Sequence, residues 1–368
     1  MKNQAFMKKV LAVTAAAAMG LSLTACSGGA ASGSDSSSSG ASSASGATSV
    51  QGASAPSDSS SVSGGTAAKD TYKIAVVKQM DHASLDEIAG AVTAELDVIA
   101  EENHITIEYE VYSGQGEQTV LKQIGDQAFA DGVDAIIPIA TLAAQVMAVC
   151  AEDTRTPVIY AAISDPEAAE VTGIDYVTGT SDALNTDFII DMMLKQNPDT
   201  KKVGLLYSLS EPNSATPVAE AREYLDSKGV GYVEATGNTN DEVIAAASVL
   251  VSEGVDAVFT PTDNIVMAAE MAIAGTFAEA GIPHYTGADS FVRNGAFATC
   301  GVNYTDLGTK TADLAYQAIT DGMGGMEDYY KMDGGIITVN TETAETLKAD
   351  YSMFASMGEL VEVSTTEE

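Results

Sequence analysis

The sequence is poor in residues that several functional classes require. Of 368 residues, 17 are Lys or Arg and 52 are Asp or Glu, so the formal net charge is -35. A surface that binds nucleic acid needs a basic patch, so this balance argues against a nucleic-acid-binding protein. It argues equally against attachment to anionic lipid through the protein's own surface. Trp is absent, and three Cys are too few for a disulfide-stabilised scaffold.

Sequence motifs that mark common enzymes are also missing. The chain has no Gly-x-Ser-x-Gly nucleophile motif, no Walker A loop and no Gly-x-Gly-x-x-Gly dinucleotide motif. Its three histidines lack metal-ligand spacing, and we expect His104 and His284 to be structural and only His82 to lie near a ligand. We expect Cys150 and Cys300 to be free and buried, with a disulfide between them as the alternative. The sequence thus predicts no catalytic residue, no metal and no cofactor.

The first 25 residues have the pattern of an export signal. Lys2, Lys8 and Lys9 are followed by an uncharged apolar run over residues 10–25, which is short for a membrane span. The run ends in Leu-Thr-Ala followed by Cys26, which resembles the lipobox of bacterial lipoproteins, where a cysteine thiol accepts lipid after signal removal. We therefore predict a signal peptide at 1–25 and a lipid on Cys26. The alternative is an ordinary signal peptide with a chance cysteine.

Residues 26–69 are expected to form a tether that begins at the lipidated cysteine. Residues 27–66 contain 17 Ser, 8 Gly and 7 Ala, a composition that cannot bury a core. A Gly/Ser coil of this length has an end-to-end distance of about 35 Å. Such a tether would hold a globular head away from a membrane.

From residue 72 onward, strands and helices are predicted to alternate, and the pattern occurs twice. Short β-branched runs such as residues 73–77 predict buried parallel strands, and apolar residues at helical spacing follow them. Gly132–Ile137 and Gly254–Phe259 match almost letter for letter. Strands alternating with helices imply a parallel sheet with helices on both faces. We therefore predict an α/β fold of two doubly wound parallel-sheet lobes joined by a hinge that the chain crosses several times.

The two lobes are expected to be discontinuous in sequence. After the repeats, two further strand–helix segments remain, and one can return to each lobe. We assign residues 70–177 and 296–326 to the N-terminal lobe. Residues 178–295 and 327–368 then form the C-terminal lobe.

Polar side chains gather where the predicted strands end. The carboxyl ends of parallel strands, beside helix N-termini, form the ligand-binding edge of open α/β sheets. Any one polar residue there could instead be an ordinary helix N-cap. The predicted ligand-binding residues are Gln79, Met80, His82, Thr141, Ser164, Asp165, Thr180, Ser181, Asp182, Glu211, Asn213, Ser214, Asp263, Asn264 and Asp289.

The charged residues restrict the kind of ligand. Only three arginines occur in the chain, and they form no cluster that could hold a polyanion such as a nucleotide. Hydroxyls and backbone N–H groups at helix N-termini could bind a single carboxylate. Asp263 or Asp289 could accept hydrogen bonds from an ammonium group. These features favour a zwitterion or a neutral polar solute.

Several short segments, taken in order, resemble one known family. They are Gln79–Asp86, Ser164–Pro166, Val177–Asp182, Ser210–Ser214, Pro261–Asn264, Ala288–Ser290, Gly295–Ala296 and Gly301–Tyr304. Together they are similar to the lipoprotein substrate-binding components of ABC transporters in the tryptophan/tyrosine-type family, over about residues 72–363. The chain departs from the family at Ala83 and Ile265, where proline and threonine are frequent.

The resemblance implies a type I periplasmic-binding fold that closes on a small solute, and several family members are linked to aromatic or other hydrophobic amino acids. We therefore expect a monomeric, lipid-anchored binding component of an ABC importer, exported to the outer face of the cytoplasmic membrane. Its partners would be a small ligand, such as an amino acid bound by hinge closure, and an ABC permease. The alternatives are a ligand-sensing subunit for a membrane kinase and a surface-anchored enzyme such as a racemase or hydrolase.

Overall fold

The computed structural model describes residues 69–366. The range Lys69–Glu368 forms one compact unit, distinct from Met1–Ala68. The predicted signal peptide, Cys26 and the tether up to residue 68 lie outside the described residues. Within residues 69–366, no helix combines the length and the apolar character needed to cross a membrane.

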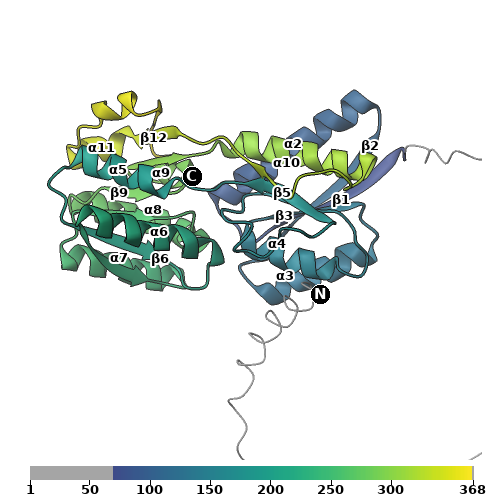
Figure 1. Cartoon of the computed structure of the whole chain (residues 1–368), viewed down its shortest axis with the longest axis horizontal. Helices are drawn as coiled ribbons and strands as arrows, with labels where there is room; N and C mark the ends of the chain where they lie inside the picture. The colour runs from purple at the N-terminus through teal and green to yellow at the C-terminus, as the bar shows by residue number, and fades with distance from the viewer. Residues whose placement is uncertain (1–68, 367–368) are drawn as a thin grey trace, which may run out of the picture. The chain divides into compact units, whose positions relative to one another are not determined.

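The first of two sheets defines the N-terminal lobe (Figure 1). Its strand order is β11-β5-β4-β3-β1-β2, and all neighbouring strands are parallel. The strands are β1 (Thr71–Lys78), β2 (Thr106–Ser113), β3 (Ala135–Ile139), β4 (Val158–Tyr160), β5 (Val177–Ser181) and β11 (Tyr330–Lys331). The helices of this lobe are α2 (Ala83–Asn103), α3 (Gln118–Ala130), α4 (Thr141–Cys150) and α10 (Tyr304–Asp321).

The second sheet defines the C-terminal lobe and has the order β13-β12-β10-β9-β8-β6-β7. Only the β10–β12 pair is antiparallel. The strands are β6 (Lys202–Tyr207), β7 (Gly231–Thr236), β8 (Ala257–Thr260), β9 (His284–Thr286), β10 (Ala298–Gly301), β12 (Ile336–Asn340) and β13 (Glu359–Val363). The helices are α5 (Thr186–Gln196), α6 (Ala215–Lys228), α7 (Asn240–Glu253), α8 (Asn264–Glu279), α9 (Asp289–Arg293) and α11 (Thr341–Leu347), with short 3-10 turns at Pro212–Ser214 and Ser352–Ser356.

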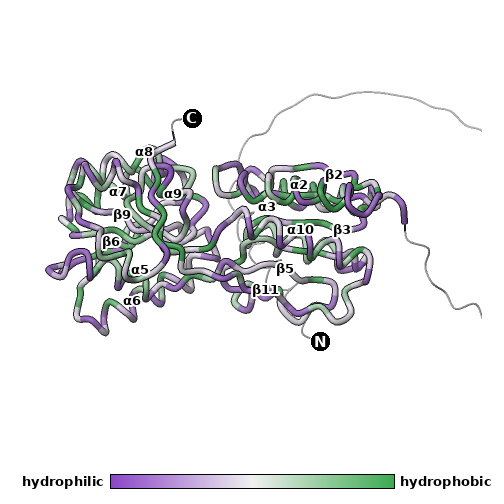
Figure 2. The backbone as a smooth tube through the Cα atoms, turned by 90° about the horizontal axis from the view of Figure 1, so that it is seen from above, coloured by the Kyte–Doolittle hydropathy of each residue, from purple (hydrophilic) through white to green (hydrophobic). Residues whose placement is uncertain are grey.

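Helices cover both faces of the first sheet because alternate residues of its strands point to opposite sides. In β1, Ile74 and Val76 pack in the core under α2 and α10, whereas Ala75 and Val77 pack in the core under α3 and α4. Hydrophobic and hydrophilic stretches alternate along α2 and α10, as expected for helices with one buried face (Figure 2). The predicted fold class, two lobes of doubly wound parallel sheets, is confirmed.

The sheets set different lobe boundaries from those expected. The sequence expectation began the C-terminal lobe at residue 178 and returned residues 296–326 to the N-terminal lobe. Instead, β5 (Val177–Ser181) pairs with β4 in the first sheet, and β10 (Ala298–Gly301) pairs with β9 and β12 in the second. Residues 330–331 also belong to the first sheet. Hydrogen-bonded pairing decides which lobe a short strand joins, and the apolar pattern of a strand does not encode its partner.

The chain passes between the two sheets three times. The crossings follow β5 at residues 182–185, β10 at residues 302–303 and β11 at residues 332–335. Three such crossings make the multi-crossover hinge that the sequence predicted.

Cys150 and Cys300, at the end of α4 and in β10, are both free, so the alternative of a disulfide between them is wrong.

The close contact between α10 and α2 depends on Gly308. A Cβ atom at Gly308 would lie 2.6 Å from the Cβ of Ala91 and 2.7 Å from the carbonyl oxygen of Ile88. By contrast, Gly90 on the exposed side of α2 has no atom within 4 Å of the corresponding position. Gly308 therefore allows two helix backbones to approach, whereas Gly90 is replaceable.

We expect Gly308→Ala to lower the free energy of unfolding by about 1–3 kcal/mol, because the added methyl group forces the two helices apart. Gly90→Ala is the matched control, and it should leave stability unchanged or raise it by up to about 1 kcal/mol through helix propensity. Urea denaturation of both variants measures the difference. Equal stability of Gly308→Ala and the wild type would contradict the packing argument.

Candidate functional site

A small cavity between the lobes collects residues that follow the strands of both sheets. Its volume is about 20 Å³. Its lining comprises His82, Ser84, Leu85, Ala140, Ala162, Ser164 and Asp182, together with Asn213, Thr262, Asp263, Asn264, Met267, Phe291 and Tyr304. This volume accommodates about one water molecule. A larger solute could therefore enter only if the lobes moved apart.

A chain of four side chains joins the lobes beside this cavity. Gln79 Nε2 donates to Glu211 Oε1 at 2.7 Å, and Asn264 Nδ2 donates to Glu211 Oε2 at 2.6 Å. His82 Nε2 lies 3.0 Å from Asn264 Oδ1. The backbone N–H of Leu142, near the start of α4, donates to Gln79 Oε1 at 3.1 Å. Because Gln79 and His82 come from the N-terminal lobe and the other two from the C-terminal lobe, we call this set the interlobe relay.

Further hydrogen bonds hold the lobes together around the relay. They join Ser84 Oγ to Ser290 Oγ (2.5 Å), Ser164 Oγ to Thr262 Oγ1 (3.0 Å) and Thr216 Oγ1 to Asp165 Oδ2 (2.8 Å). In each pair one residue belongs to each lobe. The structure therefore shows a closed arrangement in which polar groups from the two lobes satisfy one another.

Burial shifts the pKa values of the relay's two titratable groups in opposite directions, and both shifts favour the neutral form. Burial lowers the pKa of His82 to about 4, so the imidazole is neutral at pH 7. Burial, together with the nearby charge of Asp263, raises the pKa of Glu211 to about 7. Both shifts follow from removing the charged form from water, and they place the Glu211 titration near neutrality.

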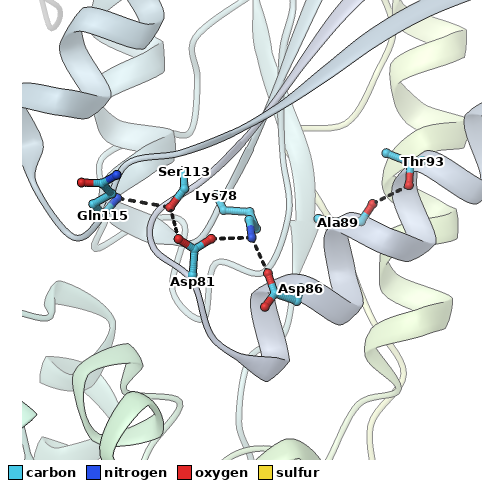
Figure 3. A network of polar contacts seen from close by, with 7 residues as sticks. All are labelled: Lys78, Asp81, Asp86, Ala89, Thr93, Ser113 and Gln115. Carbon is cyan, nitrogen blue, oxygen red and sulfur yellow. Dashed lines mark hydrogen bonds and ion pairs between the residues drawn. The ribbon is translucent and has the colours of Figure 1, made fainter. Parts of the chain in front are cut away.

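The loop that carries Gln79 and His82 is anchored by ion pairs at the end of β1 (Figure 3). Lys78 Nζ pairs with Asp81 at 2.6 Å and also with Asp86 on α2. Ser113 Oγ, from the end of β2, donates to the other oxygen of Asp81 at 2.8 Å. The hydrogen bond from Lys78 lowers the pKa of Asp81. This network fixes where the loop leaves the sheet.

Asp182 and Tyr304 meet at the hinge, on the wall of the cavity. Tyr304 OH donates to Asp182 Oδ2 at 3.0 Å, and Ser164 Oγ donates to Oδ1 at 3.0 Å. Burial raises the pKa of Asp182 above its usual range. The backbone N–H of Asp182 is a third donor to this carboxylate, which leaves one of its four lone pairs for a hydrogen bond from a ligand.

Asp263 lines the cavity but is fully engaged in structure. Its Oδ1 accepts from the backbone N–H groups of Ile265 and Val266, and so caps α8. Its Oδ2 accepts from the N–H of Ser208 and the hydroxyl of Ser214, each at 2.7 Å. Four donors occupy the lone pairs of the carboxylate. The expectation that Asp263 would accept from a ligand ammonium is therefore not supported by its geometry, whereas the N-cap alternative is.

Some buried polar atoms without a hydrogen-bond partner belong to residues of the cavity wall. Among the described residues, six such side-chain atoms occur, and four belong to residues predicted to bind ligand: His82 Nδ1, Thr141 Oγ1, Asn213 Oδ1 and Asp289 Oδ1. Buried polar groups in native proteins almost always have hydrogen-bond partners. His82 and Asn213 line the cavity, whereas Thr141 and Asp289 lie outside its wall, so the wall itself carries two buried polar atoms without a partner.

The structure brings together six of the fifteen predicted site residues on the cavity wall: His82, Ser164, Asp182, Asn213, Asp263 and Asn264. Gln79 and Glu211 support them through the relay. The others do not line this cavity. Met80 is half-buried and packs against the hydrophobic core. Thr180 Oγ1 bonds to Thr311 in α10, Ser181 Oγ accepts from Ala183 N, and Asp165 Oδ1 accepts from Ala168 N. Ser214 donates to Asp263, and Asp289 pairs with Arg293.

Four large apolar or aromatic residues on the cavity wall were missed by the sequence prediction, as were the smaller Ser84, Ala140, Ala162 and Thr262. Leu85, Met267, Phe291 and Tyr304 lie on α2, α8, α9 and α10 respectively. The prediction took residues from loops, whereas these come from the first turns of helices that begin at the cleft. Leu85 and Tyr304 stood within segments that carried the family resemblance, Gln79–Asp86 and Gly301–Tyr304.

The other two histidines have structural positions, as expected. His104 adopts left-handed backbone at the end of α2, and its N–H bonds to the carbonyl oxygens of Ala100 and Glu101. His284 is buried in β9, with Nδ1 3.0 Å from Glu270 Oε1 and Nε2 2.8 Å from Thr260 Oγ1. Within residues 69–366, no cluster of three or more His, Cys, Asp or Glu side chains could hold a metal ion.

A larger groove of about 770 Å³ lies beside the hinge segments. It is lined by parts of α5 and α6 and by residues 300–302 and 331–335. None of the unpartnered buried atoms belongs to a residue on its wall. We therefore assign the functional site to the smaller cavity between the lobes.

The N-cap role of Asp263 predicts a measurable stability loss. Asp263→Ala removes the acceptor of two helix N–H groups and leaves buried donors unpaired, so we expect the free energy of unfolding to fall by about 1–3 kcal/mol. Asp241→Ala, an exposed acid in the first turn of α7, is the matched control and should cost under about 1 kcal/mol. Thermal or urea denaturation without added ligand measures both. A small effect at Asp263 would mean that its carboxylate is free for a ligand.

Comparison with solved structures shows what the chain is similar to. A Streptococcus pneumoniae ABC domain in complex with L-Trp matches with a TM-score of 0.72 and 27% identity, over 79% of this chain and 100% of that chain. A ligand-free, open substrate-binding protein with adhesive properties from Clostridium difficile matches with a TM-score of 0.60 and 27% identity, over 80% of this chain and 100% of that chain.

Sequence comparison gives the same answer. A tyrosine-binding protein of Clostridioides difficile is 28% identical over 284 residues, which is 76% of this chain and 81% of the relative. The family model of ABC transporter substrate binding proteins matches residues 73–353, which is most of the chain. The resemblance inferred from short segments is thereby confirmed. The chain belongs to the ABC transporter substrate-binding family, whose members are binding proteins and not enzymes.

Proposed function

We propose that the chain is the lipid-anchored, extracytoplasmic binding subunit of an ABC importer and that it binds a zwitterionic amino acid between its lobes. The observation that carries the ligand class is the set of unpartnered buried atoms at the cleft. Acceptors on His82 and Asn213, both on the cavity wall, suit an ammonium group, and the Thr141 hydroxyl, next to the wall residue Ala140 at the start of α4, suits a carboxylate.

The charge of the cavity wall supports a ligand with a cationic group. The wall contains Asp182 and Asp263 but no Lys or Arg. A dianion or polyanion would therefore find no positive side chain there to offset its desolvation. An amino acid brings its own positive charge, and hydroxyls can bind its single carboxylate.

An aromatic or other hydrophobic side chain fits the rest of the wall. Leu85, Met267, Phe291 and Tyr304 present apolar surface beside the polar groups. Aromatic rings favour such surroundings, since they pack against aromatic and sulfur-containing side chains. The two relatives described in terms of tyrosine and L-Trp support the same class of ligand.

The closed arrangement supports a hinge mechanism. At equal identity, the chain is more similar to the L-Trp complex than to the ligand-free, open relative, with TM-scores of 0.72 and 0.60. The cavity of about 20 Å³ is too small for an amino acid, so binding would begin in an open state. Ligand would then favour closure because it bonds groups of both lobes at once.

The ligand proposal is tested by calorimetry on residues 69–368, the compact unit, with the twenty amino acids as probes. We expect saturable binding of L-Tyr, L-Trp or another hydrophobic amino acid, and a rise in melting temperature that grows with its concentration. Nucleosides and sugars are the control solutes. Binding of those controls without binding of any amino acid would overturn the ligand class.

The anchor and the permease are inferred from the N-terminal pattern and from the family. Cys26 follows an apolar signal-like run, and a long Ser/Gly/Ala segment leads from it to the described unit. The closed lobes would present a composite surface that an open protein lacks, which suits recognition by a permease. Permease and ATPase genes next to the gene for this chain would support the importer, whereas a kinase gene would favour a sensor.

Lipid attachment predicts a specific effect of one substitution. Cys26→Ala removes the thiol that would accept lipid, so the chain should lose its lipid mass and leave the membrane fraction. Cys150→Ala, a thiol in the described unit, is the control and should stay in the membrane fraction. Mass spectrometry and cell fractionation measure both. Unchanged membrane association of Cys26→Ala would mean that the cysteine is incidental.

A further inference from the structure

The backbone N–H of Leu142 determines which atoms of the interlobe relay donate hydrogen bonds and which accept them. The N–H of Leu142 can only donate, so the side-chain atom of Gln79 that faces it at 3.1 Å is the carbonyl oxygen. The amide nitrogen of Gln79 must then point to Glu211, where it donates at 2.7 Å. In the same way, the role of each further side chain as donor or acceptor follows from the role of the side chain before it.

The carboxylate of Glu211 determines, through Asn264, which ring nitrogen of His82 carries the proton. An ionised carboxylate only accepts, so it receives a second donor, the amide nitrogen of Asn264, at 2.6 Å. The oxygen of Asn264 must then face His82 Nε2, at 3.0 Å. An oxygen accepts, and therefore Nε2 of His82 carries the proton.

The neutral ring of His82 has one proton, so its Nδ1 is a bare acceptor. This Nδ1 is buried and has no partner, and His82 lines the cavity. The ring does not cap its own helix, although His82 stands at the N-cap of α2. The atom is thus available for a donor that comes from a ligand.

We propose that Glu211 is a positioning residue that sets the tautomer of His82 through Asn264, so that the lobes close on a ligand ammonium group with an unprotonated Nδ1 facing it. The tautomer part stands on the relay alone, and the ammonium part rests on the proposed amino-acid function. Glu211 does not itself touch the ligand in this scheme. It decides whether the site presents an acceptor or a donor.

We expect Glu211→Gln to exchange the donor and acceptor roles of Asn264 and His82. A carboxamide can accept with its oxygen but donates with its nitrogen, so only one of the two incoming donors keeps an acceptor. Gln79 is held by Leu142, so Asn264 turns instead and presents its NH₂ group to His82. The ring then moves its proton to Nδ1, and the acceptor becomes a donor.

A second substitution should restore the original direction. In Glu211→Gln with Asn264→Asp, the acid and the amide have exchanged places. The new amide donates to the new carboxylate, which also accepts from His82 Nε2–H. A merely structural role of Glu211 would not predict this rescue. Glu279→Gln, which removes an exposed acid from the same lobe, is the matched control.

The readout is the ¹⁵N NMR spectrum of labelled histidine in residues 69–368, at pH 8.5. The chain has only three histidines, and His82→Asn identifies the signals of His82. A disulfide between Ser84→Cys and Ser290→Cys, whose hydroxyl oxygens lie 2.5 Å apart, would hold the lobes closed without ligand. We expect Nε2–H in the locked wild type, the double variant and the control, and Nδ1–H in Glu211→Gln. Nε2–H in Glu211→Gln would overturn the proposal.

Protonation of Glu211 should act like the Gln substitution, which gives a test without any change at the relay. The charged group that acts on Glu211 is Asp263, and those that act on His82 are Asp86, Lys78 and Asp81. His82 stays neutral because burial lowers its pKa to about 4. Because the pKa of Glu211 is raised to about 7, its protonated form accumulates as the pH falls below 7. The His82 tautomer of the locked wild type should therefore change near pH 7, and that of Glu211→Gln should not. A tautomer that is constant from pH 8.5 to 6 in the wild type would contradict the proposal.

Binding of L-Tyr or L-Trp to the unlocked protein tests the ammonium part. Loss of a hydrogen bond to a charged group should weaken binding to Glu211→Gln roughly 10- to 100-fold, with recovery in the double variant. The amino-free analogue 3-(4-hydroxyphenyl)propionate should be affected far less. Equal losses for both compounds would overturn this part. If no amino acid binds but the tautomers change as expected, the proposed function fails and the positioning role stands.

Discussion

The buried carboxylate of Glu211 is the group on which closure of the lobes depends. A carboxylate removed from water costs several kcal/mol unless hydrogen bonds compensate it. Its two donors come from different lobes, Gln79 from the first and Asn264 from the second. Full compensation is therefore reached only when the lobes meet. The arrangement links an electrostatic requirement of one side chain to the conformation of the whole binding unit.

The other carboxylates of the cleft also need hydrogen-bond donors, and they differ in how many they have. Asp263 is satisfied within its own lobe and orders the start of α8, whereas Asp182 at the hinge has three donors and keeps one lone pair. With no Lys or Arg on the wall, the site offers acceptors more readily than positive charge. A zwitterion suits such a site because its ammonium group supplies the missing donors.

The fold brings these groups together through the direction of its strands. In parallel sheets every carboxyl end lies at the same edge, so residues from β1, β3, β4 and β5 meet those that follow β6 and β8. Three crossings of the hinge keep the two edges facing one another. Close packing of α10 on α2 at Gly308 then attaches the returning chain to the first lobe.

Sequence alone determined the fold class and the side of the sheets on which the site lies. The strand–helix alternation, repeated twice, requires parallel sheets, and polar residues at strand ends mark the cleft. Tertiary structure decided which of those residues have free atoms. Asp263 and His82 both follow buried strands, but only the hydrogen-bond partners show that one is saturated and the other has an open Nδ1. It also assigned β10 to the second sheet and added Met267 and Phe291 to the wall, because strand pairing and the facing of helix ends are contacts between residues distant in sequence.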